Sequence, residues 1–324
     1  MNETELPLVS IVVLNFNGLE FLKQTVTPIE NLSYPNKEII YVDNASIDGS
    51  VEYLKQFKNI QIVENKNNEG FNKGKNIGIQ HAKGDYVLSL DGDILIQNTD
   101  IIEKLLQCAT KDTGLIQLPL FDVDKDRTKY YGIYFAWYGI NRNIPWASKE
   151  EILKLPGMVP IGSATGACLF FKRDVWNKLE GLDESQVYHL DESDIGPRFS
   201  IYGYKNYLYT QRILIHLGVK HAASLKLYAR RYLYLFSGEG RSILKNYSFW
   251  DTCACLTLFI FYQLIKSVRF ALLKRNLSIL KYSFSSVYIF ISNLPQTLIL
   301  RRKIQIERST PADIFLKIKP PRLL

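Results

Sequence analysis

Short runs of aliphatic and β-branched residues, each followed by polar residues, constrain the fold of this chain more than any other feature. Four such runs occupy residues 9–14, 38–42, 60–63 and 86–90, and stretches of helical character separate them. Runs of this length that end at polar turns are typical of buried strands. Strands that alternate with helices predict an α/β protein with a doubly wound, mostly parallel, Rossmann-like sheet. Such a sheet binds ligands at the carboxyl ends of its strands, where Asn15, Asp43 and Asp91 stand in this chain.

The strand pattern continues to about residue 216 and then stops. Further runs occupy 115–118, 166–173 and 213–216, whereas the aromatic-rich stretch 130–146 is interpreted as an insertion or lid. Beyond about residue 225 the sequence changes to aromatic, aliphatic and basic residues. We therefore expect an α/β domain over residues 1–225 and a basic, aromatic-rich helical region over residues 226–324.

The net charge of +8 is an average over two unlike segments. Residues 1–225 hold 23 basic and 28 acidic side chains, whereas residues 226–324 hold 17 basic and 4 acidic ones. The second segment contains an uncharged run, 252–265, and another apolar run, 282–300. Helices of this composition are typical of the interface of an anionic membrane, so we expect peripheral association. A membrane span near 252–273 or 282–300 and a soluble helical subdomain are the alternatives. Nucleic acid is not expected as a partner, because the segment is too apolar for a solvated basic arm.

The cysteine pattern and the N-terminal residues indicate the cellular compartment in which the protein is expected. The four cysteines form neither a paired metal-ligand pattern nor a disulfide framework, which is typical of a reducing environment. Residues 1–5 are acidic where a signal peptide is basic. We therefore expect a cytoplasmic protein at the inner face of the cell membrane.

Two carboxylates flank a glycine directly after the fourth strand run. Asp91 and Asp93 are both placed where a parallel sheet binds ligand, and Gly92 lets a backbone approach closely. Carboxylates at this spacing can bind a hard divalent cation such as Mg²⁺ or Mn²⁺ together with phosphate oxygens. The alternative is a plain Asp-Gly turn.

Other strand ends and one glycine-rich passage offer polar groups for a nucleotide. Short polar side chains that converge on one crevice suit recognition of a nucleobase and a ribose, although helix capping and turn formation account for such residues equally well. Lys73 and Lys75 follow Gly70 near an expected helix start, a suitable place for a diphosphate, yet the passage matches neither a P-loop nor a dinucleotide fingerprint. The predicted nucleotide-binding residues are Asn15, Asn17, Asp43, Asn44, Gly70, Lys73, Lys75 and Asp91.

An acidic cluster supplies candidates for a general base. Asp191, Glu192 and Asp194 lie within four residues, and mutual repulsion should raise the proton affinity of at least one of them. The alternative is an acidic helix N-terminus that the helix dipole stabilises. His216 ends an apolar run and could bind a metal ion, or it could be a hydrogen-bonded core residue.

Together and in this order, the motifs resemble family 2 glycosyltransferases of the GT-A fold, particularly the rhamnosyltransferase-like branch. The resemblance covers about residues 8–225. Its motifs are 12–17 (VVLNFN), 42–50 (VDNASIDGS), 68–72 (NEGFN) with 76–78 (NIG), 91–93 (DGD), 165–168 (TGAC) with 181–184 (GLDE), the acidic cluster with Arg198, Gly203-Tyr204, and His216.

The resemblance implies roles for these residues. Asp43 would bind the base, Asn15, Asn17 and the two lysines would line the nucleotide pocket, and Asp91 and Asp93 would form the metal pair. Glu192 would be the general base, with Asp191 as the alternative because the family's usual order is Glu-Asp. His216 would contact metal or diphosphate, with His221 as its alternative.

These roles imply an inverting transfer of a sugar from a nucleoside-diphosphate sugar to a glycan or lipid-linked acceptor, with a divalent cation and a carboxylate base. A sugar nucleotidyltransferase would share the sheet and the metal chemistry. An inactive, membrane-bound scaffold of the same fold is the non-enzymatic alternative.

Overall fold

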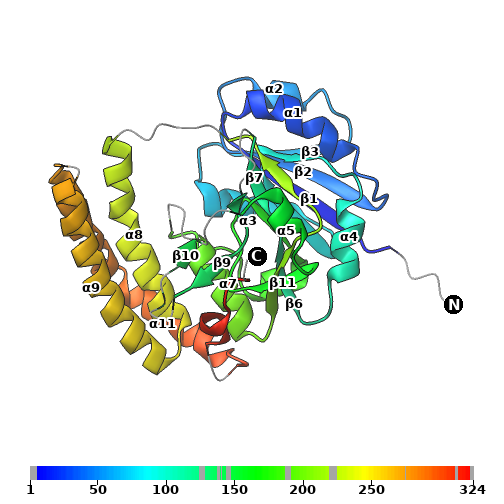
Figure 1. Cartoon of the computed structure of the whole chain (residues 1–324). Helices are drawn as coiled ribbons and strands as arrows, with labels where there is room; N and C mark the ends of the chain where they lie inside the picture. Colours follow the sequence, from blue (N-terminus) through cyan, green and yellow to red (C-terminus); the bar gives the residue numbers. More distant parts are fainter. Residues whose placement is uncertain are drawn as a thin grey trace.

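The computed structural model describes residues 6–123, 128–136, 139, 141–143, 147–186, 191–218, 225–273, 275–310 and 313–321. Figure 1 shows an α/β part built around a sheet and, beside it, a group of long helices from the C-terminal region.

One eight-stranded sheet forms the centre of the α/β part. Its strand order is β11-β13-β6-β12-β4-β1-β2-β3. The strands are β1 (Val9–Asn15), β2 (Lys37–Asp43), β3 (Ile60–Glu64), β4 (Tyr86–Asp91), β6 (Thr113–Gln117), β11 (Met158–Ile161), β12 (Cys168–Lys172) and β13 (Lys205–Tyr209). β1 to β4 are parallel, β13 is parallel to β6, and β12 and β11 run antiparallel to their neighbours. The predicted doubly wound, mostly parallel sheet is therefore confirmed.

Helices cover both faces of this sheet, because successive strand residues point to opposite sides. Ile11 and Val13 of β1 pack in one core cluster with Leu22, whereas Val12 packs in a second cluster with Ile79. The first cluster holds α1 and α4, and the second holds α3, α6 and α7. The helices of the α/β part are α1 (Leu19–Glu30), α2 (Ser50–Leu54), α3 (Phe71–His81), α4 (Ile101–Cys108), α5 (Lys149–Leu153), α6 (Arg173–Lys178) and α7 (Asp191–Ile201).

A smaller sheet stands beside the carboxyl end of β4. Its order is β5-β14-β7-β8, with β5 (Ile94–Ile96), β14 (Leu214–His216), β7 (Leu120–Asp122) and β8 (Thr128–Tyr130). β9 (Ile133–Phe135) and β10 (Asn141–Asn143) form a separate pair. Tyr131, Tyr134 and Phe135 are buried in the core, so this part of the predicted lid is core structure. Residues 137, 138, 140 and 144–146 of that stretch lie outside the described residues.

The C-terminal region is helical, as predicted. It comprises α8 (Leu225–Asn246), α9 (Phe249–Leu273), α10 (Ser278–Ser292), α11 (Leu294–Ile306) and the short 3₁₀ helix η1 (Ile314–Lys317). Phe236 of α8 and Phe259 of α9 belong to one buried cluster with Phe135 and Ile201. The helices therefore share a core with the α/β part.

Candidate active site

The strand register brings the first predicted residues together. Asn15 pairs with Asp43 across β1 and β2, and Leu14 pairs with Asp91 across β1 and β4. The Asn15 amide donates hydrogen bonds to Asp43 Oδ1 (3.0 Å) and to Ser46 Oγ (3.2 Å), and the Ser46 backbone N–H donates to Asp43 Oδ2 (2.8 Å). These bonds fix the orientation of the buried Asp43 carboxylate at the carboxyl end of β2.

Asn17 supports the same turn. Its backbone has a left-handed φ of 49°, its N–H donates to Ser46 Oγ (2.8 Å), and its Oδ1 accepts from the Ile47 N–H (2.9 Å). Asparagine tolerates this backbone conformation better than most residues. Asn17 therefore lies beside Asp43 and holds the loop that borders it, while a contact with nucleotide stays a prediction.

Asn44 has a structural position one residue after Asp43. Its amide nitrogen donates to Asn68 Oδ1 (3.0 Å) and to the Gly70 carbonyl (3.1 Å). Its amide oxygen accepts from Asn65 Nδ2 (2.9 Å) and from the Glu69 N–H (3.1 Å). Both donors and both acceptor positions of the amide are thus used within the protein. Asn44 thus holds the loop that leads to Gly70. Gly70 precedes α3 with a φ of +81°, a backbone conformation that glycine adopts more easily than other residues.

The two predicted lysines separate on α3. Lys75 is 1% exposed, and its ammonium nitrogen lies 2.8 Å from Asp91 Oδ1 and 5.3 Å from the centre of the Phe71 ring. Lys73 is 45% exposed and pairs with Glu69 at 2.5 Å. Lys75 therefore provides a buried positive charge at the strand ends, and Lys73 faces solvent.

The N-terminus of α7 brings two of the acidic residues to this cation. Asp191 lies close enough to Asp91 and Lys75 for both charges to affect its ionisation. Burial raises the pKa of Asp191 to about 6, and the Asp91 charge adds to this effect. Burial together with the Asp191 charge raises the pKa of Glu192 to about 8. Two carboxyl groups at one helix N-terminus thus have the proton affinity that a base near neutral pH requires.

Neighbouring residues hold these carboxyl groups in position. Thr165 Oγ1 donates to Glu192 Oε1 at 2.9 Å. Gly166 packs against Asp191 so closely that a Cβ at this position would overlap Asp191 Oδ2. Asp191 is 4% exposed, whereas Glu192 is only partly buried, so Glu192 is the more accessible of the two.

Asp194, the third residue of the acidic cluster, has a different role. It pairs with Arg198 (2.7 Å) and with Lys245 of α8 (2.8 Å), and Asn246 donates to its Oδ1 (2.7 Å). Burial by itself would raise the pKa of Asp194, but the two cations lower it. Asp194 therefore connects α7 to the C-terminal helices.

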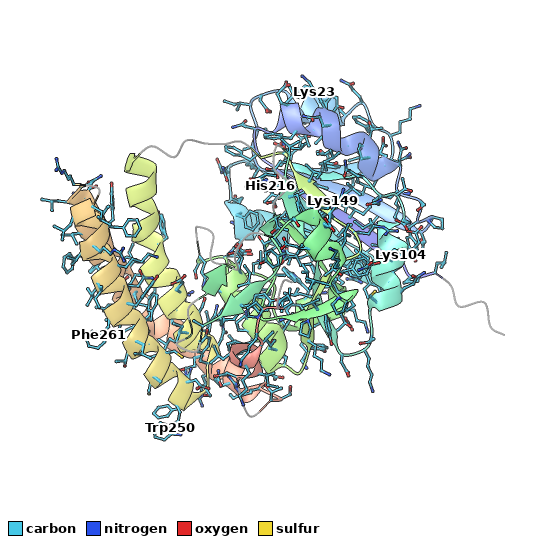
Figure 2. The ribbon with its side chains drawn as sticks, in the orientation of Figure 1. Lys23, Lys104, Lys149, His216, Trp250 and Phe261 are labelled. Carbon is cyan, nitrogen blue, oxygen red and sulfur yellow. The ribbon has the colours of Figure 1, made fainter. Side chains whose placement is uncertain are left out.

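Asp93 and His216 meet where β5 and β14 pair. His216 stands opposite Ile94, and His216 Nε2 lies 3.6 Å from Asp93 Oδ2. Gly218 fills the space beside both, because a Cβ there would overlap the carboxylate and the imidazole ring. Figure 2 labels His216 within the α/β part.

The predicted metal ligands do not all converge. Among the residues that the structure describes, no three Asp, Glu, His or Cys side chains form a group that could hold a metal ion. Asp91 is turned toward Lys75, whereas Asp93 and His216, the other two predicted ligands, lie side by side. A carboxylate and an imidazole suit a divalent cation that takes its other ligands from diphosphate oxygens and water. His221 lies outside the described residues.

Several supporting residues were not predicted as part of the site. A serine at position 46 predicts a cap for the helix that follows, whereas in the structure Ser46 links Asn15, Asn17 and Asp43. Thr165 and Gly166 lie within the motif 165–168, which by itself predicts no role for either residue. Their contacts with Asp191 and Glu192 depend on which strand lies beside α7, so the spacing of residues along the chain could not predict these contacts.

Solved structures of low sequence identity share this fold. S. aureus TarS, crystallised with UDP-GlcNAc, superposes with a TM-score of 0.63 at 12% identity over 96% of this chain and 90% of that one. A mannosyltransferase from Pyrobaculum calidifontis, in complex with GDP-Man and Mn²⁺, gives a TM-score of 0.55 at 14% identity over 97% and 84%. The fold is therefore of the GT-A glycosyltransferase type.

Sequence comparison identifies the family. A cholesterol galactosyltransferase of Borreliella burgdorferi is 29% identical over 182 residues, which are 53% of this chain and 47% of that protein. The chain spans less than half the length of the first curated relatives that it matches. The model of glycosyl transferase family 2 matches residues 10–179, more than half of the chain. With this match and the site at the strand ends, the chain belongs to glycosyl transferase family 2.

Proposed function

We propose that the chain is an inverting glycosyltransferase that moves a sugar from a nucleoside-diphosphate sugar to a glycan or lipid-linked acceptor in polysaccharide or glycoconjugate assembly. The observation that carries the proposal is the pair of proton-binding carboxyl groups, Asp191 and Glu192, beside Asp91 at the end of β4 and Lys75 of α3. Sugar transfer from a nucleoside diphosphate needs a base for the acceptor hydroxyl and a positive charge for the diphosphate, and these residues would supply both.

The donor would lie across the ends of β1, β2 and β4. Asp43, held by Asn15 and Ser46, would accept hydrogen bonds from the base or the ribose. The buried Lys75 ammonium would attract the diphosphate. Asp93 and His216 would hold a divalent cation, Mg²⁺ or Mn²⁺, which when bound would neutralise the leaving diphosphate as a Lewis acid. The Mn²⁺ and nucleotide sugars bound to the solved relatives support such a cofactor and donor.

Glu192 would act as the general base, because it is more exposed than Asp191 and can reach an acceptor. Its carboxylate would take the proton of the acceptor hydroxyl as that oxygen attacks the anomeric carbon. The bond from the anomeric carbon to the phosphate oxygen breaks, and the nucleoside diphosphate leaves on the opposite face. Single displacement therefore inverts the anomeric configuration.

The motif order favours the rhamnosyltransferase-like branch and a hexosyltransferase-like activity. We further propose that transfer takes place at the cytoplasmic face of a cell membrane, where a lipid-linked acceptor would be found.

A panel of nucleotide sugars, with Mg²⁺ or Mn²⁺ and with or without a lipid-linked acceptor, tests the proposal. Release of nucleoside diphosphate and an inverted product are expected, and Glu192→Gln should abolish transfer while nucleotide still binds. Pyrophosphate release would instead identify a nucleotidyltransferase. Nucleotide binding without turnover across the panel would favour a scaffold, and a retained anomeric configuration would refute single displacement.

A further inference from the structure

Exposed apolar side chains are concentrated in the C-terminal helices. Of the 23 large hydrophobic residues that are exposed in the described part of the chain, 18 lie between Phe249 and Ile314. Soluble proteins expose such residues singly, so a dense group of them indicates a contact surface.

One side of α9 presents most of this surface. Its inner stripe, which includes Cys255, Phe259 and Ala271, is buried against the neighbouring helices. The outer side carries Trp250 (80% exposed) and Ile265 (69% exposed). Figure 2 shows Phe261 projecting from α9 on the side away from the α/β part, and Trp250 at the lower end of the same helix.

The surface continues onto α10 across an apolar groove. Leu264 and Val268 of α9 and Phe284 of α10 line the groove and are themselves exposed. Ser283 Oγ in the groove donates to Ser267 Oγ at 2.8 Å, so these two polar groups satisfy each other. We name this continuous surface the outer face, formed by Trp250, Leu258, Phe261, Leu264, Ile265, Val268, Leu272, Leu277, Phe284 and Tyr288.

The charges around the outer face are mainly positive, with Asp251 in the first turn of α9 as the acidic exception. Residues 252–306 contain eight Lys and Arg side chains and no Asp or Glu. Arg269 follows Ile265 by four residues on α9, and Lys281 follows Leu277 by four residues, so each lies one helical turn from an apolar member of the face. Apolar area with an excess of cations at its border complements a bilayer with anionic headgroups.

The packing favours helices that lie along a bilayer. By length and composition, α9 is the one helix of the described part that could cross a membrane. However, its inner stripe includes Gln263, which donates to Glu239 Oε2 of α8 at 3.2 Å. Arg269 also interrupts the apolar side before the helix ends. Insertion across the bilayer would remove α9 from α8 and bury these polar groups in hydrocarbon.

We propose that the outer face of α9 and α10 is a docking surface for an anionic bilayer, with both helices parallel to the membrane plane. The apolar side chains enter the interface and the flanking cations contact the headgroups. This binding is independent of sugar transfer, because none of its residues belongs to the candidate active site.

Vesicle flotation of the full chain tests the docking surface. Phe261→Asn with Ile265→Asn should weaken binding to vesicles of phosphatidylcholine and phosphatidylglycerol more than tenfold. Arg269→Gln with Lys281→Gln should weaken it about 25-fold, at roughly fivefold per charge, and only on the anionic vesicles. Leu6→Asn with Leu153→Asn, two exposed apolar residues of the α/β part, is the matched control and should bind as the unmodified chain does. Circular dichroism should report the same fold for every variant.

Three results would overturn the proposal. Equal flotation of all variants would show that the outer face does not bind the membrane. An alkaline carbonate wash that leaves the chain in cell membranes would indicate a span instead. A lipid-free dimer that Phe261→Asn with Ile265→Asn converts to monomer, without loss of flotation, would assign the face to a second copy of the chain.

Discussion

Replacing Glu192 by Gln should stabilise the protein at the same time as it abolishes transfer. Burial and the Asp191 charge hold the pKa of Glu192 at about 8, above its ordinary value of 4.5. Between these two values the folded state keeps a proton that the unfolded state has lost, so the free energy of unfolding falls as pH rises. Gln has no proton to lose, and its side-chain oxygen can still accept the hydrogen bond from Thr165.

The two pKa values set the size of the effect. Each unit of difference between the two pKa values changes the unfolding free energy by about 1.36 kcal/mol, so the full difference from 4.5 to about 8 corresponds to roughly 5 kcal/mol. Glu192 is partly exposed and water screens its charge, so we expect about 2–3 kcal/mol. The difference in unfolding free energy between the variant and the unmodified chain should be small below pH 4.5, the ordinary pKa of glutamate. It should grow as pH rises and level off above about pH 8.

Urea unfolding followed by tryptophan fluorescence, repeated across this pH interval, measures the effect. Glu52→Gln, at an exposed glutamate of α2, is the control and should show no such gain. If Glu192→Gln followed the same pH dependence as the unmodified chain, Glu192 would not keep its proton near neutral pH, and the argument for it as base would fail.

Three further substitutions test other parts of the structure. Lys75→Met should leave Asp91 without its cation, abolish nucleotide binding measured by calorimetry, and cost about 3 kcal/mol in urea unfolding; unchanged binding would refute a diphosphate contact. Asp93→Asn should raise the Mn²⁺ concentration needed for half-maximal nucleotide binding at least tenfold, and an unchanged requirement would place the metal elsewhere. Lys245→Met should cost about 3–5 kcal/mol of unfolding free energy, because it leaves two buried carboxylates with one cation fewer; a loss below 1 kcal/mol would show that the network is weak.

The main sheet could be predicted from sequence because its strands are long and end at polar residues. β1 and β2 begin and end within a residue or two of their predicted positions. The small sheet is different, since β5, β7 and β14 have three residues each. The run 213–216 predicts β14, but no run predicts β5 or β7. The contact of Asp93 with His216 depends on this pairing, so both residues could be predicted as candidates but not as neighbours.

Helical geometry could have sharpened two of the site predictions. Residues two apart on a helix point about 200° apart, so Lys73 and Lys75 could not both face the strand ends once the helix start was known. Asp194 and Arg198 are four residues apart, the spacing of an ion pair on one helix face. Which lysine is buried could not be predicted, because it depends on how α3 packs on the sheet.

The ion pairs around α7 connect the C-terminal helices to the candidate active site. Lys245 of α8 lies 2.8 Å from Asp194 and 2.6 Å from Asp183, and Arg241 lies 3.4 Å from Asp183. These cations lower the pKa of the buried Asp183 against the effect of its burial, and Lys245 does the same for Asp194. Asp194 lies two residues after Glu192, so α8 fixes the helix that presents the proposed base. A chain cut at the predicted boundary near residue 225 would lose these cations along with the outer face. Loss of transfer after such a cut would therefore reflect a displaced base as much as a lost membrane contact, which is why single substitutions on the outer face are the cleaner test.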